Sequence, residues 1–143
     1  MSQLVPFVIG VALALAVGAY ARWIGFDRDR AFYPTLLIVI ACYYVLFSVM
    51  GGVPRITVVE ISIATIFVVA ASLGFRRNLW LVVAGLSAHA ILDAFHGSVT
   101  SNPGVPSWWP AFCLTYDITA AGFPALTLLR SPALSKPRVA SAP

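Results

Sequence analysis

Three of the five acidic residues lie within long apolar stretches of the sequence, and no lysine or arginine stands beside them. They are Glu60, Asp93 and Asp117, and both histidines of the chain, His89 and His96, flank Asp93. A bare carboxylate removed from water loses much of its solvation free energy, so such a group must be protonated, paired or bound to a metal. Ionisable groups inside membrane-spanning segments mark functional sites. These residues are therefore the first candidate site of the chain.

The spacing of the histidines and carboxylates predicts that they share helix faces. His89, Asp93 and His96 stand at positions i, i+4 and i+7, which places them within a sector of roughly 60° on an α-helix. Cys113 and Asp117 are four residues apart in the next apolar stretch and share a face there. Consecutive antiparallel helices usually pack together, so the two faces can point at each other.

This pattern predicts a metal site. A histidine and a carboxylate at i, i+4 can chelate one ion, and side chains of neighbouring helices can complete the coordination. His89 and His96 are two turns apart, so an ion at His89 and Asp93, an ion at Asp93 and His96, or two adjacent ions all fit a regular helix better than one ion shared by both histidines. Mixed nitrogen and oxygen ligands suit zinc, iron or manganese. The predicted ligands are His89, Asp93, His96, Cys113 and Asp117.

Three functions are compatible with such a cluster. In a metal-dependent membrane hydrolase or oxidoreductase, Glu60 would be the general base for a metal-activated water, and the substrate would be lipidic or small and apolar. In a cation or proton-coupled transporter, the same groups would carry the cation or proton. In a non-catalytic protein they would form a hydrogen-bonded network that locks the helices. A single bundle of 143 residues has little room for alternating access unless it forms a homo-oligomer, which favours a binding or catalytic site.

Composition identifies the class of protein. The chain is 60% hydrophobic and 10% charged, whereas soluble domains are about 25% charged. The net charge of +4 comes mainly from arginines that flank the apolar stretches. The chain lacks a basic patch with interleaved aromatic residues, so nucleic acid is not an expected partner. Cys42 and Cys113 lie in apolar stretches, so a disulfide is not expected. Membrane lipids are the expected surroundings.

Five stretches are long enough to span a membrane, which takes about 20 apolar residues. The sequence therefore predicts an all-α, polytopic membrane protein whose residues 1–130 form one helical bundle, followed by a disordered cytoplasmic tail over Ser131–Pro143. The first stretch lacks a basic segment before it and a clear cleavage site, and is expected to be a retained helix rather than a signal peptide. The predicted spans are Leu4–Ile24, Phe32–Met50, Ile56–Phe75, Leu79–Phe95 and Trp109–Leu129.

Charge placement predicts the orientation in a bacterial cytoplasmic (inner) membrane. Eight of the nine basic residues flank the connections and the tail on one side of the five spans, and Arg55 alone lies on the other. The positive-inside rule then places the N-terminus outside and the C-terminus in the cytoplasm. Trp108 and Trp109 fall at the outer interface, as an aromatic belt would place them. The candidate ligands lie in the outer half of the membrane in this orientation.

Two further features of the sequence concern packing. Gly10, Ala14 and Gly18 recur every four residues, a stripe of small side chains that allows close helix approach. The outer loop Gly97–Ser107 contains an Asn102-Pro103-Gly104 turn signal. This loop is either a lid over the polar cluster or a plain connector.

The stretch His89-x3-Asp93-x2-His96, the Asn102-Pro103 and Val105-Pro106 pairs and Cys113-x3-Asp117 resemble an uncharacterised family of small bacterial integral membrane proteins, domain of unknown function 6010. The resemblance covers about residues 84–123, and an early acidic residue in the family's third span is similar to Glu60. Gly97 stands where the family has a second consecutive histidine, which reduces the possible ligands. The resemblance implies a shared site but no known activity.

Overall fold

Within residues 4–136, which the computed structural model describes, five long helices form an antiparallel bundle. Each helix is long and apolar enough to cross a membrane. The prediction of an all-α, multi-pass membrane protein is therefore confirmed, although the fourth helix continues four residues past its predicted end at Phe95. The helices are α1 (Val5–Ile24), α2 (Phe32–Met50), α3 (Pro54–Arg76), α4 (Trp80–Val99) and α5 (Trp109–Arg130).

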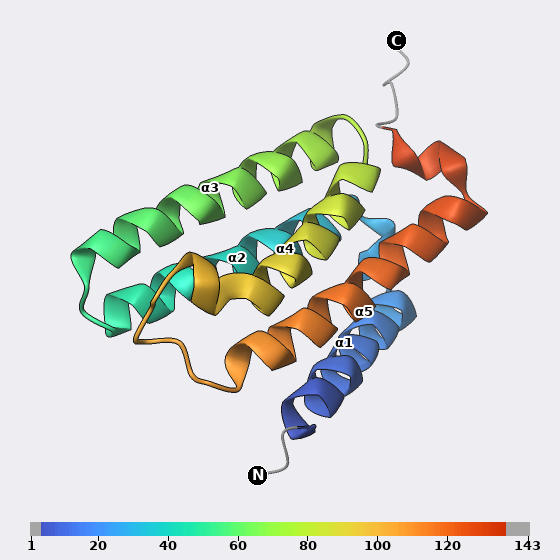
Figure 1. Cartoon of the computed structure of the whole chain (residues 1–143). Helices are drawn as coiled ribbons and strands as arrows, with labels where there is room; N and C mark the ends of the chain where they lie inside the picture. Colours follow the sequence, from blue (N-terminus) through green and yellow to red (C-terminus); the bar gives the residue numbers. More distant parts are fainter. Residues whose placement is uncertain (1–3, 137–143) are drawn as a thin grey trace.

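Helix α4 lies at the centre of the bundle, where it packs against α5, α3 and α2. Helices α2 and α3 pack along each other on one side, and α1 packs mainly against α5 on the other (Figure 1). The predicted pairing of α4 with α5 is thus among the most extensive helix contacts in the described part of the chain. It brings together the two helices that carry most of the candidate ligands.

Proline and glycine residues set several of the helix ends. Pro6, Pro54 and Pro110 occupy the first turns of α1, α3 and α5, where a missing N–H is tolerated because it would have no helical partner. Gly25 ends α1 with φ of 86°, and Gly52 adopts φ of 68° in the turn between α2 and α3. Both values lie in the left-handed region that only glycine adopts readily.

The buried polar residues gather at one end of the bundle. This end, which we call the loop end, is the one that carries the α4–α5 loop of residues 100–108. The interior nearer the other end consists of apolar side chains that are at most 2% exposed. These are Leu37, Ala71, Val82, Leu86 and Leu128. The sequence predicts that the candidate ligands share the outer half of the membrane, and the structure places them together in the half of the bundle nearer the loop end.

The predicted small-residue stripe is a packing surface between α1 and α5. Gly10, Ala14 and Gly18 are all buried. A Cβ atom added at Gly10 would collide with the Phe112 carbonyl and the Thr115 hydroxyl of α5. The stripe therefore allows the backbones of the two helices to approach at this position.

We expect Gly10→Ala to lower the thermal stability of the purified protein by about 1–3 kcal/mol, the usual cost of overpacking. The matched control is Gly122→Ala in α5, where an added Cβ has no atom within 4 Å and the better helix propensity of alanine favours the helix. Thermal unfolding in detergent measures both. Equal melting temperatures for the two variants would contradict the close contact.

The segment predicted to be a disordered tail, Ser131–Pro143, begins with structure. A 3-10 helix, η2, covers Pro132–Ser135. The Leu79 N–H donates to a carbonyl of this turn at 3.0 Å, and Arg30 donates to another at 2.6 Å. Leu79, directly before α4, and Arg30, in the α1–α2 connection, thus supply donors for the backbone of this turn. Residues 137–143 lie outside the described residues.

Candidate metal centre

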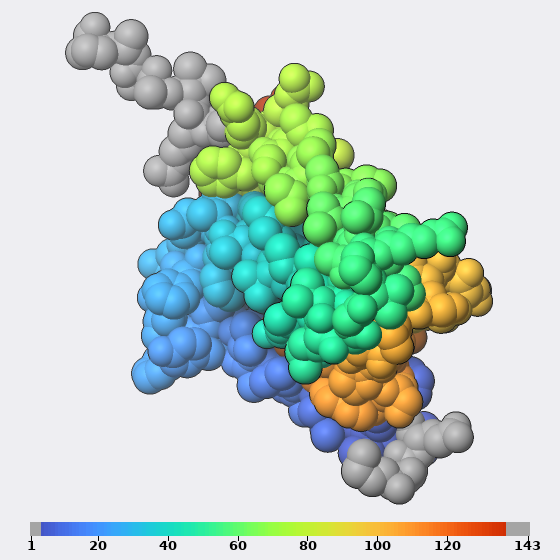
Figure 2. All heavy atoms as spheres, turned by 90° about the vertical axis from the view of Figure 1, so that its left-hand side faces the viewer, coloured from blue at the N-terminus to red at the C-terminus, as the bar shows by residue number. Residues whose placement is uncertain are grey.

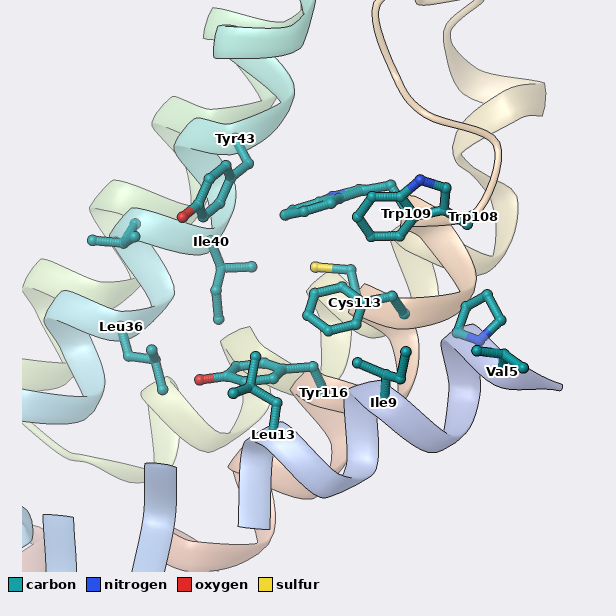
Figure 3. A pocket seen from close by; sticks show the side chains of 13 residues that line it. Val5, Ile9, Leu13, Leu36, Ile40, Tyr43, Trp108, Trp109, Cys113 and Tyr116 are labelled. Carbon is teal, nitrogen blue, oxygen red and sulfur yellow. The ribbon is translucent and has the colours of Figure 1, made fainter. Parts of the chain in front are cut away.

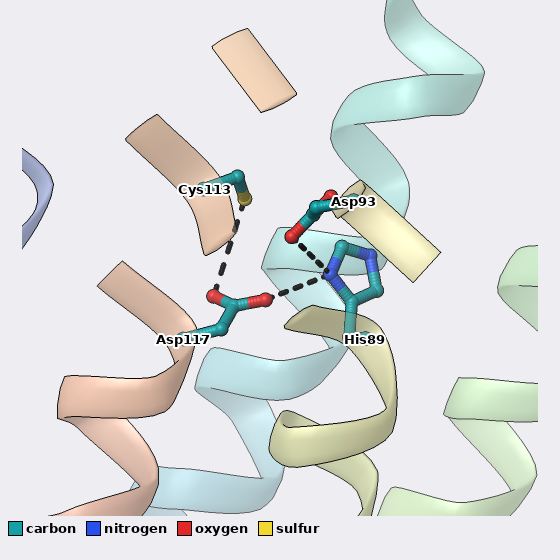
Figure 4. Close-up of side chains that lie close together, drawn as sticks. All are labelled: His89, Asp93, Cys113 and Asp117. Atoms are coloured by element: carbon teal, nitrogen blue, oxygen red, sulfur yellow. Dashed lines mark hydrogen bonds and ion pairs between the residues drawn. The ribbon is translucent and has the colours of Figure 1, made fainter. Parts of the chain in front are cut away.

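Four buried side chains from α4 and α5 converge at the loop end of the bundle (Figure 4). Each offers one potential ligand atom, and the four atoms all lie within 4.8 Å of one another. The side chains are at most 2% exposed. We call this group the four-residue centre: His89, Asp93, Cys113 and Asp117.

The imidazole of His89 is the hub of the centre. Its Nδ1 atom lies 2.7 Å from Asp117 Oδ2 and 3.4 Å from Asp93 Oδ2. Figure 4 shows both carboxylates pointing at this one nitrogen, Asp93 from the same helix and Asp117 from α5. The two carboxylates lie in the interior, as the sequence predicts, and they meet at a single histidine.

The thiol of Cys113 completes the group on the α5 side. Its Sγ atom lies 4.0 Å from Asp117 Oδ1. Zinc binds nitrogen and oxygen at about 2.0–2.2 Å and sulfur at about 2.3 Å, so tetrahedral ligand atoms are roughly 3.3–3.8 Å apart. To reach that geometry, the separations of up to 4.8 Å need to shrink by about one ångström, and the 2.7 Å between His89 Nδ1 and Asp117 Oδ2 needs to widen by a similar amount. The donor set of one nitrogen, two carboxylates and one thiol therefore fits a transition metal ion.

The centre carries acidic groups without a permanent cation. The apolar stretches around Asp93 and Asp117 contain no lysine or arginine, and in the described part of the chain His89 is the basic group paired with them. One oxygen of Asp93, Oδ2, is buried and has no hydrogen-bond partner among the described residues. A buried carboxylate oxygen without a donor is unfavourable, and a cation at this point would remove that cost.

A second polar cluster lies beside the centre and contains the other two predicted site residues. His96 Nε2 lies 3.0 Å from Glu60 Oε1, where an N–H can donate to the carboxylate. The same oxygen accepts hydrogen bonds from the Thr100 hydroxyl at 2.8 Å and the Asn102 amide at 3.0 Å. The other oxygen of Glu60, Oε2, is buried without a partner among residues 4–136.

The structure therefore divides the predicted ligand set in two. His89, Asp93, Cys113 and Asp117 come together, whereas His96 faces Glu60 on α3. The physical reason is the two-turn separation of His89 and His96 along α4. Because of it, His96 reaches α3, whereas His89 reaches α5. Of the arrangements that the sequence left open, an ion on the His89 side of Asp93 is the one that this geometry supports.

The α4–α5 loop is held over the second cluster. The Asn102 amide donates to the Tyr44 carbonyl at 3.1 Å as well as to Glu60. Gly104 lies so close to α2 that an added Cβ would collide with the Phe47 carbonyl. Figure 2 shows the loop, in orange, against the turn between α2 and α3. These contacts fix the position of the loop over the second cluster; its role as a lid stays a prediction.

We expect Asn102→Ala to destabilise the protein by about 1–3 kcal/mol, because it removes the three hydrogen bonds that the side chain makes with Tyr44, Glu60 and Gly104. The control is Ser101→Ala, at an exposed neighbouring position of the same loop. Hydrogen exchange of the loop amides should rise in Asn102→Ala alone. Unchanged exchange in that variant would show that other contacts hold the loop.

Tyr44 of α2 joins the two clusters, and the sequence analysis missed it. Its hydroxyl donates to Asp93 Oδ1 at 2.7 Å. Its ring stacks on the imidazole of His96, with centroids 3.8 Å apart and planes inclined by 13°. A tyrosine in an apolar span needs a hydrogen-bond partner for its hydroxyl, and this need could have indicated that Tyr44 belongs to the polar site. Thr100, the residue directly after α4, was also missed, although it stands only four residues after His96.

No protein-family model, curated protein or solved structure matches the chain. The chemistry of the centre must therefore be inferred from its own geometry.

Proposed function

We propose that this multi-pass membrane protein binds one divalent transition metal ion, such as zinc, iron or manganese, at the four-residue centre. The observation that carries the proposal is the convergence of four buried ligand atoms of suitable chemistry within 4.8 Å. His89, Asp93, Cys113 and Asp117 would hold the ion. Tyr44 would position Asp93 through its hydrogen bond to Oδ1, in the way that hydrogen bonds to metal-bound carboxylates usually do.

Charge balance supports a metal ion over a purely structural network. Two carboxylates, a neutral histidine and the thiolate form of Cys113 carry a charge of about −3, of which a divalent cation cancels two. In a network without an ion, protons shared among the same groups would have to supply that balance. Asp93 Oδ2 has no hydrogen bond among the described residues and only the 3.4 Å ion pair with His89, which supports a site that an ion completes.

Beyond metal binding, we propose that the protein catalyses a metal-dependent reaction, hydrolytic or oxidoreductive, on a substrate dissolved in the membrane. A bound transition metal supplies Lewis acidity and an activated water in such sites. The general-base role of Glu60 stays a prediction. In the structure Glu60 belongs to the second cluster, where three donors share one of its oxygens. A carrier of cations or protons is less well supported, because the bundle interior away from the loop end is apolar.

Element analysis tests the metal ion directly. Protein purified in detergent without chelator is expected to contain about one transition metal ion per chain. Chelator treatment should lower its melting temperature, because an ion that binds only the folded state at 100 times its Kd contributes about 2.7 kcal/mol. The control is Cys42→Ser, at an exposed thiol on α2, which should retain the ion. A metal-free wild type with an unchanged melting temperature would overturn the proposal.

We also propose the inner membrane of a bacterium as the location, with the loop end facing outward. The eight-to-one asymmetry of basic residues supports this orientation. A reporter enzyme that is active only in the periplasm should be inactive when fused to the C-terminus, and a fluorescent protein that matures only in the cytoplasm should be active there. The opposite pair of results would reverse the orientation.

A further inference from the structure

A deep apolar groove lies between α1 and α2, with α5 as its floor (Figure 3). Its volume is about 550 Å³, within the range of about 300–1,000 Å³ that is typical of ligand pockets. The side chains that line it are mostly aliphatic and aromatic. They include Ile9 and Leu13 of α1, Leu36 and Ile40 of α2, and Phe112 and Tyr116 of α5.

The helix packing explains why the groove exists. The small-residue stripe holds α1 against α5. Helix α2 packs instead against α3 and α4, so α1 and α2 stand apart as two walls. Ile9 and Leu13 remain about half exposed, at 51% and 45%, although they lie in a membrane-spanning helix. At this depth the medium that fills an open apolar groove is lipid rather than water.

The groove reaches the proposed metal centre. Cys113 lines its floor and is also one of the four residues of the centre. Figure 3 shows the Cys113 sulfur among the groove residues, and Figure 4 shows the same side chain beside Asp117. One residue thus separates an apolar binding space from a buried cluster of metal ligands.

The rim of the groove has the character of a membrane interface. Trp108, Trp109 and Tyr43 lie at its loop end, and such aromatic residues are enriched at the level of lipid head groups. Cys113 is one helical turn deeper, or about 6 Å along the axis.

We propose that the groove binds the hydrocarbon chain of a membrane lipid and presents the polar end of that lipid to the Cys113 side of the centre. The apolar lining fits the chain, and the aromatic rim fits the more polar part above it. The centre lies at the depth where the two parts join. The contribution of the metal to this arrangement rests on the function proposed above, whereas binding of the chain does not.

Photo-crosslinking of the full chain in phosphatidylcholine nanodiscs tests this proposal. The probe is a phosphatidylcholine that carries a diazirine in one acyl chain. Labelling of the peptide that contains Cys113 is expected to fall by about tenfold in Ile9→Trp, because the larger ring displaces roughly two methylene groups of the bound chain. Leu13→Trp fills the same groove and provides a second variant.

The matched control is Val8→Trp, next to Ile9 on the same helix but outside the groove. It should leave labelling of the Cys113 peptide unchanged. Equal labelling in the filled and control variants would overturn the proposal, as would a crosslink between two copies through the groove. Metal content is measured on the same samples. Metal-free wild type with intact labelling would refute the metal centre alone, and metal-loaded protein without groove labelling would refute the lipid site alone.

Discussion

Asp117→Ala is expected to lose the metal ion, whereas His96→Ala retains it. Asp117 offers one oxygen to His89 and turns the other towards Cys113, so its removal takes away a ligand at the middle of the centre. We expect metal affinity to fall by more than 100-fold, since even outer-shell changes cost 10–100-fold. His96 faces Glu60 instead. Element analysis of the two purified variants, side by side with the wild type, provides the measurement.

Substitution of the bound ion by Co²⁺ gives a spectroscopic test of whether Cys113 is a ligand. A thiolate ligand to Co²⁺ produces a charge-transfer band, which Cys113→Ser should remove while the ion stays bound with weaker affinity. Cys42→Ser is the matched thiol control, because Cys42 is exposed on α2. Loss of the ion in His96→Ala with retention in Asp117→Ala would transfer the site to the second cluster and refute the assignment.

His89→Ala is expected to be the most destabilising single change at the centre. It leaves Asp93 and Asp117 buried at 2% and 0% exposure without the imidazole that both of them approach. Removal of one partner from a buried ionic group costs about 3–5 kcal/mol. The measurement is the free energy of unfolding of metal-free protein in detergent, which separates this effect from metal binding.

A double-mutant cycle shows whether the loss arises from the pair. His89→Ala combined with Asp117→Ala should be less destabilising than the sum of the two single changes, with a coupling of about 1–3 kcal/mol. The cycle of His89→Ala with Cys42→Ser, at an exposed thiol on α2, should be additive to within about 0.5 kcal/mol. Additivity of His89 with Asp117 would contradict the contact at 2.7 Å between their side chains.

The helices and their polar faces could be predicted from the sequence because both depend on local pattern. Apolar length defines a membrane span, and the predicted limits of Phe32–Met50 are those of α2 in the structure. The i, i+4, i+7 spacing on α4 also placed His89, Asp93 and His96 inward, where all three are at most 3% exposed. In a membrane-spanning helix, polar residues that recur on one face therefore identify the face that is buried in the bundle.

The partners of each face could not be predicted in the same way, because they depend on how the helices are arranged around α4. Periodicity does not show that His96 faces α3 while His89 faces α5. Nor does it show that Tyr44 of α2 reaches Asp93. The groove between α1 and α2 follows from which helix pairs pack closely, a property of the whole bundle. The 3-10 turn after α5 depends likewise on donors from distant parts of the chain.

The two contacts of Tyr44 give the protein a thermodynamic linkage between its polar clusters. The hydroxyl is bonded to Asp93 and the ring lies flat on His96, and the side chain between them is rigid. A ligand that draws Asp93 away from the Tyr44 hydroxyl also alters the stacking free energy of the Tyr44 ring on His96. Because linkage is reciprocal, a molecule that enters from the loop and displaces His96 must change the affinity at Asp93 by the same factor.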